Sequence, residues 1–437
     1  MPVSSSAIPL PPSAMTFYPF DLYRFYTDFL GAIQHSYQRH GHIFRWFALN
    51  PFTVLLGADA NQWALVTQQK SLSAAKAWER PIGYLFHGGL MLRDGPDHRQ
   101  HRKLLMPAFR QEALHHYLTT SEPIIDRHLQ SWPQHCSNIY PRVKELTLEI
   151  AIQSFFGISQ PKELLVYNQL ITDIVAGSIA FNRVPVLGRL YQRAVRARRA
   201  LVKLLGPLVQ ERRRHHTEDM MGQLCRSVDE EGRQMTDEEI VDQMIFIMMA
   251  AHDTTASTLS SLFYELAQHP EWHQRIRREA EAAAHVPVAQ RPDHLPEALM
   301  VIRETLRRHT PLKVLPRVTN EDLEFQGFLL PKDTHVAVFP SFTHRMKEYW
   351  TDPDRFDPLR FGDARAEHKK HPFAYAPFGG GMHSCLGQFF AEKFLSVIIG
   401  KISMRCSWRI PDIELVRFQQ VPIHIPRTLP VELEANL

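Results

Sequence analysis

Residues 237–268 predict one unbroken helix, and this helix restricts the fold more than any other feature of the sequence. Thr236 and Glu239 form a capping-box pattern at its start, and Pro270 lies just beyond its far end. At roughly 1.5 Å per residue the helix would be about 48 Å long. Its middle, MIFIMMAA (244–251), is apolar on all sides, as expected for a helix that crosses a protein interior. We therefore expect the rest of the chain to surround this helix.

The remaining sequence is also mainly helical, with short strands in two places. Apolar residues recur at a spacing of three to four in four further segments, 142–156, 190–214, 295–309 and 388–403. The segment IFRWFALNPFTVLLG (43–57), broken by Asn50-Pro51, predicts a β-hairpin, and further strands are expected in 323–339 around a turn at 331–333. The first thirty residues are rich in proline and aromatic residues and predict an extended arm on the surface.

The composition excludes several classes of protein. The 50 Lys and Arg residues against 46 Asp and Glu give a net charge of +4, too weak to indicate nucleic-acid binding. The four cysteines are scattered and form no CxxC pair, so they indicate neither a disulfide framework nor a zinc ribbon. No run of 18 apolar residues and no signal peptide are found, so we expect a cytoplasmic protein without a transmembrane helix.

The segment APFGGGMHSCLGQFFA (376–391) is the strongest candidate for chemistry. Three consecutive glycines remove side chains where another group must approach the backbone closely. Cys385 lies at or just before the start of a predicted helix, a position that lowers the pKa of a thiol. A thiolate there could be a nucleophile or a metal ligand. The alternative, a structural cysteine in a turn, does not explain its spacing from Phe378 and the glycines.

Two polar pairs are uninformative when each is considered alone. Glu304 and Arg307 lie on one face of a predicted helix, and exposed pairs of this kind contribute only about 0.3 kcal/mol. His98 and Arg102 also share a helix face, which by itself is typical of a solvated surface.

A polar cluster, residues 252–255, follows the apolar middle of the long helix. It is either an ordinary polar exit from a buried segment or a site that handles protons. Thr254 can donate a hydrogen bond to the carbonyl four residues earlier and so open the helix locally, and Asp253 could pass protons inward.

Taken together and in this order, these motifs resemble the cytochrome P450 family, the haem-thiolate monooxygenases, over nearly the whole chain. The cysteine segment matches the family pattern F-G-x-G-x-[RH]-x-C-x-G, and ETLR (304–307) matches its E-x-x-R. DPLRF (357–361) and AAHDTT (250–255) match two further elements. The resemblance implies a mainly α fold with a small β-rich lobe at about 30–70 and 310–345, and a single catalytic domain over 1–437. It also implies haem b between the long central helix and the helix that follows the cysteine loop.

The resemblance also implies roles for individual residues. Cys385 looks like the thiolate ligand of the haem iron, and such a ligand favours O–O cleavage. Phe378, Gly379, Gly387 and Ala250 are similar to other haem-contacting positions. His98, Arg102, Arg317 and His383 are similar to the positions that bind the two haem propionates, which need cationic or donor partners.

Two further groups of residues match family positions. Glu304, Arg307 and Arg360 look like a buried ion network that locks the cysteine loop. Asp253 and Thr254 look like the acid and the alcohol that deliver protons during oxygen activation. Ala251 departs from the glycine that is frequent in the family, which puts the detailed shape of the oxygen groove in doubt.

The implied reaction inserts one oxygen atom from O2 into a C–H bond or alkene of a large apolar substrate: a fatty acid, terpenoid, steroid or retinoid. The pocket wall is expected to comprise Trp78, Leu85, Phe86 and Leu90 from segment 75–92, with Met249, Ala250, Val314 and Leu315. Ordinary core packing is the alternative for each of these residues. A peroxide-driven or isomerising haem-thiolate enzyme and a haem-binding sensor without turnover are the alternative functions.

Electrons from NAD(P)H are expected to arrive from a separate ferredoxin or flavodoxin with its reductase. Arg99, Lys103 and Arg110 could offer positive charge to that partner. We expect a monomer. Residues 183–214 contain ten Lys and Arg but a single acid, Glu211, which predicts either a solvated helix face or peripheral contact with an anionic membrane.

Overall fold

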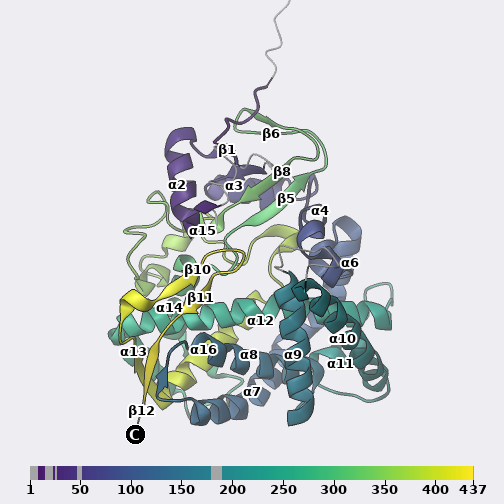
Figure 1. The fold of residues 1–437 in the computed structure, drawn as a ribbon, viewed down its shortest axis with the longest axis vertical. Helices are drawn as coiled ribbons and strands as arrows, with labels where there is room; N and C mark the ends of the chain where they lie inside the picture. The colour runs from purple at the N-terminus through teal and green to yellow at the C-terminus, as the bar shows by residue number, and fades with distance from the viewer. Residues whose placement is uncertain (1–7, 15–22, 25–26, 47–51, 179–188, 437) are drawn as a thin grey trace, which may run out of the picture.

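The long helix predicted from the sequence forms the axis of the fold. The structure is a computed structural model, and it describes residues 8–14, 23–24, 27–46, 52–178 and 189–436. Helix α12 (Asp237–Gln268) crosses the middle of the molecule (Figure 1). Its capping box is formed, because the Glu239 amide donates to Thr236 Oγ1 at 3.2 Å and the Thr236 amide donates to Glu239 Oε2 at 2.8 Å. The predicted bounds of this helix are confirmed.

Most other helices lie on one side of α12, and the β-rich lobe lies on the other (Figure 1). The four further helices predicted from periodicity are confirmed within two residues at each end as α8, α10, α14 and α16. The α-helices besides α12 are α2 (Phe29–His40), α3 (Ala58–Gln62), α4 (Ala74–Trp78), α5 (Tyr84–Phe86), α6 (Gly95–Leu105), α7 (Gln111–Ser131), α8 (Tyr140–Phe156), α9 (Pro161–Ser178), α10 (Arg189–Arg214), α11 (Met220–Arg226), α13 (Pro270–Ala282), α14 (Pro296–Arg308), α15 (Pro340–Thr343) and α16 (Gln388–Arg405).

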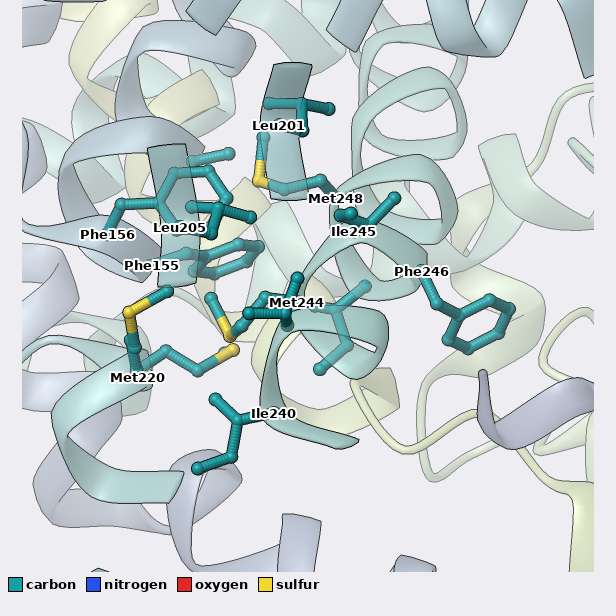
Figure 2. Packing of buried hydrophobic residues seen from close by; sticks show 14 of the residues in the cluster. Phe155, Phe156, Leu201, Leu205, Met220, Ile240, Met244, Ile245, Phe246 and Met248 are labelled. Atoms are coloured by element: carbon teal, nitrogen blue, oxygen red, sulfur yellow. The ribbon is translucent and has the colours of Figure 1, made fainter. Parts of the chain in front are cut away.

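The first half of α12 is held by apolar packing on several neighbours. Figure 2 shows Met244 and Ile245 beside Phe155 of α8, Leu205 of α10 and Met220 of α11. All five side chains are buried. Each side chain of this size contributes about 1.5–3 kcal/mol when it leaves water, so this cluster fixes the helices against one another.

The main sheet of the β-rich lobe has the strand order β1-β2-β8-β5-β3. The predicted hairpin is confirmed, because β1 (Ile43–Trp46) pairs antiparallel with β2 (Phe52–Leu55); the connection 47–51 lies outside the described residues. The other strands are β3 (Leu72–Ser73), β5 (Leu315–Thr319) and β8 (His335–Val338). Residues 8–14 of the predicted arm run along this lobe, where the Arg45 amide donates to the Pro12 carbonyl at 2.8 Å.

Three smaller sheets complete the structure. Strands β6 (Leu323–Phe325) and β7 (Phe328–Leu330) form a hairpin whose turn residues Gln326 and Gly327 both have positive φ. The C-terminal part, which the sequence assigned to the helical body, also contains strands. These are β9 (Cys406–Arg409), β10 (Arg417–Gln419), β11 (Ile425–Thr428) and β12 (Val431–Ala435); β12 lies between β9 and β4 (His135–Cys136).

A fully buried carboxylate joins α14 to the segment that follows the main sheet. Glu304 accepts two hydrogen bonds from Arg307, at 2.7 and 2.9 Å, and one from Nε of Arg360 at 3.1 Å. None of the three side chains is exposed to solvent. Their burial differs from the exposed pair that the spacing of Glu304 and Arg307 suggested when considered alone. Arg360 also donates to Glu367 Oε2 at 2.9 Å, so two carboxylates neutralise two guanidinium groups.

This ion network reaches the cysteine loop through one histidine. Arg307 Nη1 donates to the carbonyl of His344 at 2.7 Å. The ring Nε2 of His344 accepts the amide N–H of Ala376, the first residue of the glycine-rich segment, at 3.0 Å. Burial, together with nearby Arg307, lowers the pKa of His344 to about 3, so the ring stays neutral and can accept this bond.

Replacement of Glu304 by glutamine tests the importance of the buried charge. We expect Glu304→Gln to lower the free energy of unfolding by about 3–5 kcal/mol, because two buried guanidinium groups lose their shared counter-charge. The matched control is Glu297→Gln on the same helix, which breaks a partly exposed pair with Arg275 and should cost at most about 1 kcal/mol. Chemical denaturation measures both changes, and equal losses would contradict a structural role for the network.

Candidate active site

The cysteine loop has two positions at which the backbone shape favours glycine. Gly379 and Gly381 have φ values of +72° and +64°. A Cβ atom on Gly381 would lie 1.9 Å from the carbonyl oxygen of Leu65. The loop closes on itself, because the Cys385 amide donates to the Phe378 carbonyl at 2.9 Å. The glycines therefore allow the loop to lie against the neighbouring chain and to present Cys385 in a fixed position.

Protein atoms are packed around the Cys385 thiol, while the residue as a whole keeps an exposed part. Burial raises the pKa of this thiol, while the Gly387 N–H that bonds to it and the Arg102 guanidinium act in the opposite direction. The lowered pKa expected from the nearby helix start is therefore wrong for the protein alone, because loss of water outweighs both groups.

His98 and Arg102 lie on α6 and point toward the cysteine loop. Arg102 Nη1 donates to the Ser384 carbonyl at 2.7 Å, and Nη2 donates to Ser384 Oγ at 3.1 Å. His98 is 1% exposed, so the solvated face that the isolated pair suggested is wrong. Burial, with His383 and Arg102 adding to it, lowers the pKa of His98 to about 3, and the ring is neutral at pH 7. Among the described residues, nothing accepts or donates a hydrogen bond at His98 Nδ1.

A second cationic group, Arg317 of β5, is nearly buried and has few hydrogen-bond partners among the described residues. In the described part of the chain its one hydrogen bond runs from Nη1 to the carbonyl of neighbouring Pro316, at 2.7 Å. Burial lowers its pKa to about 10, so the guanidinium is still charged at pH 7. A buried cation with one neutral acceptor and a buried histidine nitrogen without a partner fit an acidic ligand. These residues therefore fit the propionates of the haem that the resemblance implies.

His383 has a different partner from the one expected. Its Nε2 lies 3.2 Å from Oδ1 of Asp94, and its ring packs on that of His98 with centroids 4.1 Å apart. Asp94 also accepts from the hydroxyl of Ser73 at 2.5 Å and from the amide of Ala74 at 3.1 Å. Contact of His383 with a propionate would therefore use the other ring nitrogen. Asp94 was not predicted as a site residue: it stands at the N-cap position of α6, but its side chain bonds to Ser73 and Ala74 rather than to α6.

The polar cluster of α12 is built as the sequence suggested. Thr254 is partly exposed and donates from Oγ1 to the Ala250 carbonyl at 2.8 Å. Asp253 is 7% exposed, and its Oδ1 lies 3.2 Å from Nζ of Lys144 on α8. The ion pair was missed because no local pattern connects α8 with α12.

The cysteine loop and the middle of α12 border the same apolar cluster. Met249, Ala250, Ala251 and Leu386 are partly buried and all pack against it. The middle of α12 and the residue that follows Cys385 therefore meet through this cluster. Phe378 lies at the edge of a second cluster, next to the loop it closes.

The predicted pocket residues fall into two groups. Trp78, Met249, Val314 and Leu315 are partly buried, which leaves surface to contact a ligand. Leu85, Phe86 and Leu90 are buried in the apolar cluster, with exposed fractions of 2%, 1% and 8%. In the structure these three side chains pack in the protein core, and a pocket wall would use the same side chains.

One of the basic residues predicted to contact a redox partner already forms an ion pair within the protein. Arg99, Lys103 and Arg110 are exposed, but Lys103 pairs with Glu230 at 2.9 Å.

Within the basic segment 183–214, residues 183–188 lie outside the described residues. Arg193, Arg198, Arg212 and Arg213 form ion pairs with Asp173, Asp242, Asp219 and Asp237 respectively. Arg189, Arg196, Arg199, Lys203 and Arg214 remain exposed on α10. Within the described residues we find no helix with the length and apolar character that a membrane span requires.

Known relatives resemble this chain over most of its length. A cytochrome P450 of Mycobacterium tuberculosis, numbered 136, is 37% identical over 82% of this chain and 74% of its own length. Abscisic acid 8'-hydroxylase 1 of Arabidopsis thaliana is 30% identical over 93% of this chain and 87% of its own. Human cytochrome P450 26B1 is 29% identical over 89% of this chain and 79% of its own.

A solved structure and a family model agree with these relatives. The retinoic acid-bound cyanobacterial CYP120A1 superposes with a TM-score of 0.88 at 26% identity, covering 98% of this chain and all of that one. The family model for cytochrome P450 matches residues 9–425. The mainly helical fold, the cysteine loop and these matches together show that the chain belongs to the cytochrome P450 family, the haem b monooxygenases of the oxidoreductase class.

Proposed function

We propose that this monooxygenase hydroxylates an apolar carboxylic acid of the terpenoid or retinoid kind, with electrons delivered by a separate redox protein. The observation that carries the proposal is the apolar cluster shared by Leu386, which follows Cys385, and by Met249, Ala250 and Ala251, which precede Asp253 and Thr254 on α12. It supports a site in which a sulfur ligand and a proton-handling pair border the same apolar region.

Haem retention is assigned to groups around the cysteine loop. Cys385 would ligate the iron, and its Gly387 N–H bond would moderate the charge on sulfur. His98, Arg102 and Arg317 would hold the propionates, since the two arginines supply positive charge and the neutral His98 ring supplies a nitrogen without a partner among the described residues. When bound, the haem supplies the activation of O2.

Asp253 and Thr254 are assigned to proton delivery. The Thr254 hydroxyl donates to the Ala250 carbonyl, and rotation about its side chain would let it donate toward the haem side of α12 instead. Asp253 is the acidic group next to it in the chain and is the source of protons in this assignment. Met249 and Ala250 would exclude water from the space beside them.

The substrate class is inferred from the pocket and from the relatives' names. The partly buried wall residues Trp78, Met249, Val314 and Leu315 suit an apolar body. One relative is named for abscisic acid, and the similar solved structure holds retinoic acid. Both compounds are terpenoid-derived carboxylic acids. They narrow the expected substrates, which from the sequence were fatty acids, terpenoids, steroids or retinoids, to acids of the terpenoid or retinoid kind.

The redox partner is inferred from the exposed positive groups beside the cysteine loop. Arg102 contacts that loop directly, and Arg99 and Lys103 lie on the same helix and are exposed. An acidic ferredoxin or flavodoxin would be attracted to such a surface.

Turnover with labelled oxygen tests the proposed reaction. With NADPH, a surrogate ferredoxin and its reductase, we expect retinoic acid or abscisic acid to gain one oxygen atom derived from labelled O2. Mass spectrometry measures the label. Label from water, or no oxygen gain by any acid in the panel, would contradict the proposal. A parallel reaction with hydrogen peroxide alone separates a peroxide-driven enzyme, which would need neither NADPH nor redox proteins.

Removal of the Thr254 hydroxyl tests the assigned proton pathway. In Thr254→Ala we expect NADPH consumption to continue while a larger fraction of it ends as hydrogen peroxide, because protons reach oxygen in the wrong order. Optical titration should show little change in substrate affinity. Thr258→Ala, one turn further along the same helix, is the matched control and should stay coupled. Full coupling in Thr254→Ala would assign the role to Thr255 or to a water molecule.

A further inference from the structure

Lys313 lies in the segment that joins α14 to β5, and its side chain is buried. Its exposed fraction is 2%, although lysine is almost never fully buried unless it is paired. The next two residues, Val314 and Leu315, are partly buried and belong to the expected pocket wall. Ser341 Oγ donates to the Lys313 carbonyl at 3.1 Å and so fixes the backbone there. The protein therefore holds an amine in its interior, next in the chain to residues expected to contact the substrate.

The Lys313 amine has no partner within the described part of the chain. No carboxylate lies within ion-pair distance of it, and no carbonyl or hydroxyl accepts a hydrogen bond from it. Lys401 is also buried, but its Nζ lies 2.7 Å from Asp126 and 3.2 Å from Glu122. Burial, with Arg345 adding to it, lowers the pKa of Lys313 to about 7, so ammonium and amine are both present at neutral pH. Either form leaves N–H groups without acceptors.

Two neighbours of Lys313 also have buried polar atoms without partners. Arg345 and His424 interact electrostatically with Lys313, and with each other. Arg345 pairs with exposed Asp354 through Nη1, yet among the described residues nothing bonds to its Nε or to Nδ1 of His424. The His424 amide donates to the Pro311 carbonyl at 2.9 Å, which holds that segment beside the one that carries Lys313. Polar groups from three segments thus lack partners in one region.

The other titratable groups of this region are already paired. Glu265 of α12 accepts a hydrogen bond from Arg308 Nη1 at 2.9 Å, and its Oε1 lies 2.6 Å from Nε2 of His309. Nδ1 of His309 lies 3.1 Å from Nε2 of His424, and both ring nitrogens of His344 are hydrogen-bonded. Burial lowers the pKa of all three histidines, so the rings are neutral at pH 7. Within the described residues, no acid is left to neutralise the amine.

A buried cation whose donors face no acceptor fits an anion. Removing an unpaired charge from water is costly, and a bound anion offsets that cost. A water molecule would satisfy an N–H group, but it would not neutralise the charge.

We propose that Lys313, together with Nε of Arg345, binds an anion inside the protein: the carboxylate of the acidic substrate or a small free anion. A carboxylate and a free anion offer the same chemistry to the amine, namely negative charge and hydrogen-bond acceptors. In the first case Lys313 determines the specificity for acids, and that case rests on the proposed function. The second case is independent of it.

The experiment compares the haem-loaded wild type with Lys313→Met, which removes the charge at similar length, and with Lys313→Arg, which keeps it. The matched control, Lys401→Met, removes a buried lysine that has carboxylate partners. Retinoic acid and retinol, which share one apolar body and differ in the carboxylate, are titrated by optical spectroscopy. Thermal unfolding is measured with and without chloride, with gluconate, a bulky anion, keeping the ionic strength constant.

If the substrate carboxylate is the anion, Lys313→Met should bind retinoic acid at least about tenfold more weakly, the effect of losing one charge-assisted hydrogen bond. Retinol should bind equally well to both proteins, and Lys313→Arg should keep its affinity for the acid. Wild-type affinity for retinoic acid should fall above about pH 7, because the amine then loses the proton that carries its charge. The affinity for retinol should not change with pH over the same range.

If a free anion occupies the site, chloride should raise the unfolding temperature of the wild type and of Lys313→Arg but not that of Lys313→Met. Without chloride or acid, Lys313→Met should unfold at a higher temperature than the wild type, because methionine has no charge to bury. Lys401→Met should unfold at a lower temperature, because it leaves two carboxylates without their cation, and its response to chloride should equal that of the wild type.

The proposal is overturned if Lys313→Met changes neither the preference for retinoic acid over retinol nor the response to chloride. It is also overturned if Lys313→Met, like Lys401→Met, unfolds at a lower temperature without any ligand, because the amine would then be paired within the protein. If no acid is oxidised in the NADPH reaction, the proposed function fails, while the chloride measurements still decide whether Lys313 binds an anion.

Discussion

The buried ion network of Glu304, Arg307 and Arg360 is the interaction on which the rest of the site depends. It is expensive to form, because three charged side chains leave water, and it is stable only while each partner is present. Through Arg307 and His344 it fixes the backbone at Ala376, where the cysteine loop begins. The start of the cysteine loop is thus tied to buried charges that lie elsewhere in the protein.

The candidate site is held in place by two sources of rigidity. The loop is fixed by its glycines and by the network, and α12 is fixed by apolar packing along its first half (Figure 2). Between them, the side chain of Asp253 is held by an ion pair to α8 rather than by Thr254. A rigid frame is suited to catalysis, because reacting groups must be held at defined positions.

The sequence was sufficient to predict those structural features that depend on residues close together in the chain. The capping box and Pro270 set the ends of α12, and the E-x-x-R spacing identified Glu304 and Arg307. Features that depend on distant residues could not be predicted. Burial of His98 arises from packing against His383, and desolvation of the Cys385 thiol outweighs the local effect of its helix. Strand β9 begins where α16 ends, with no glycine or proline to mark the change, so the C-terminal sheet was missed.

The most direct test of the whole account is the optical spectrum of the ferrous protein with carbon monoxide. Ligation by the Cys385 thiolate predicts the long-wavelength Soret band that is diagnostic of the family. Cys385→Ala should lose this band, while Cys406→Ala, which removes a buried cysteine at the end of α16, should keep it. A wild-type protein without the band, or its retention in Cys385→Ala, would contradict the account.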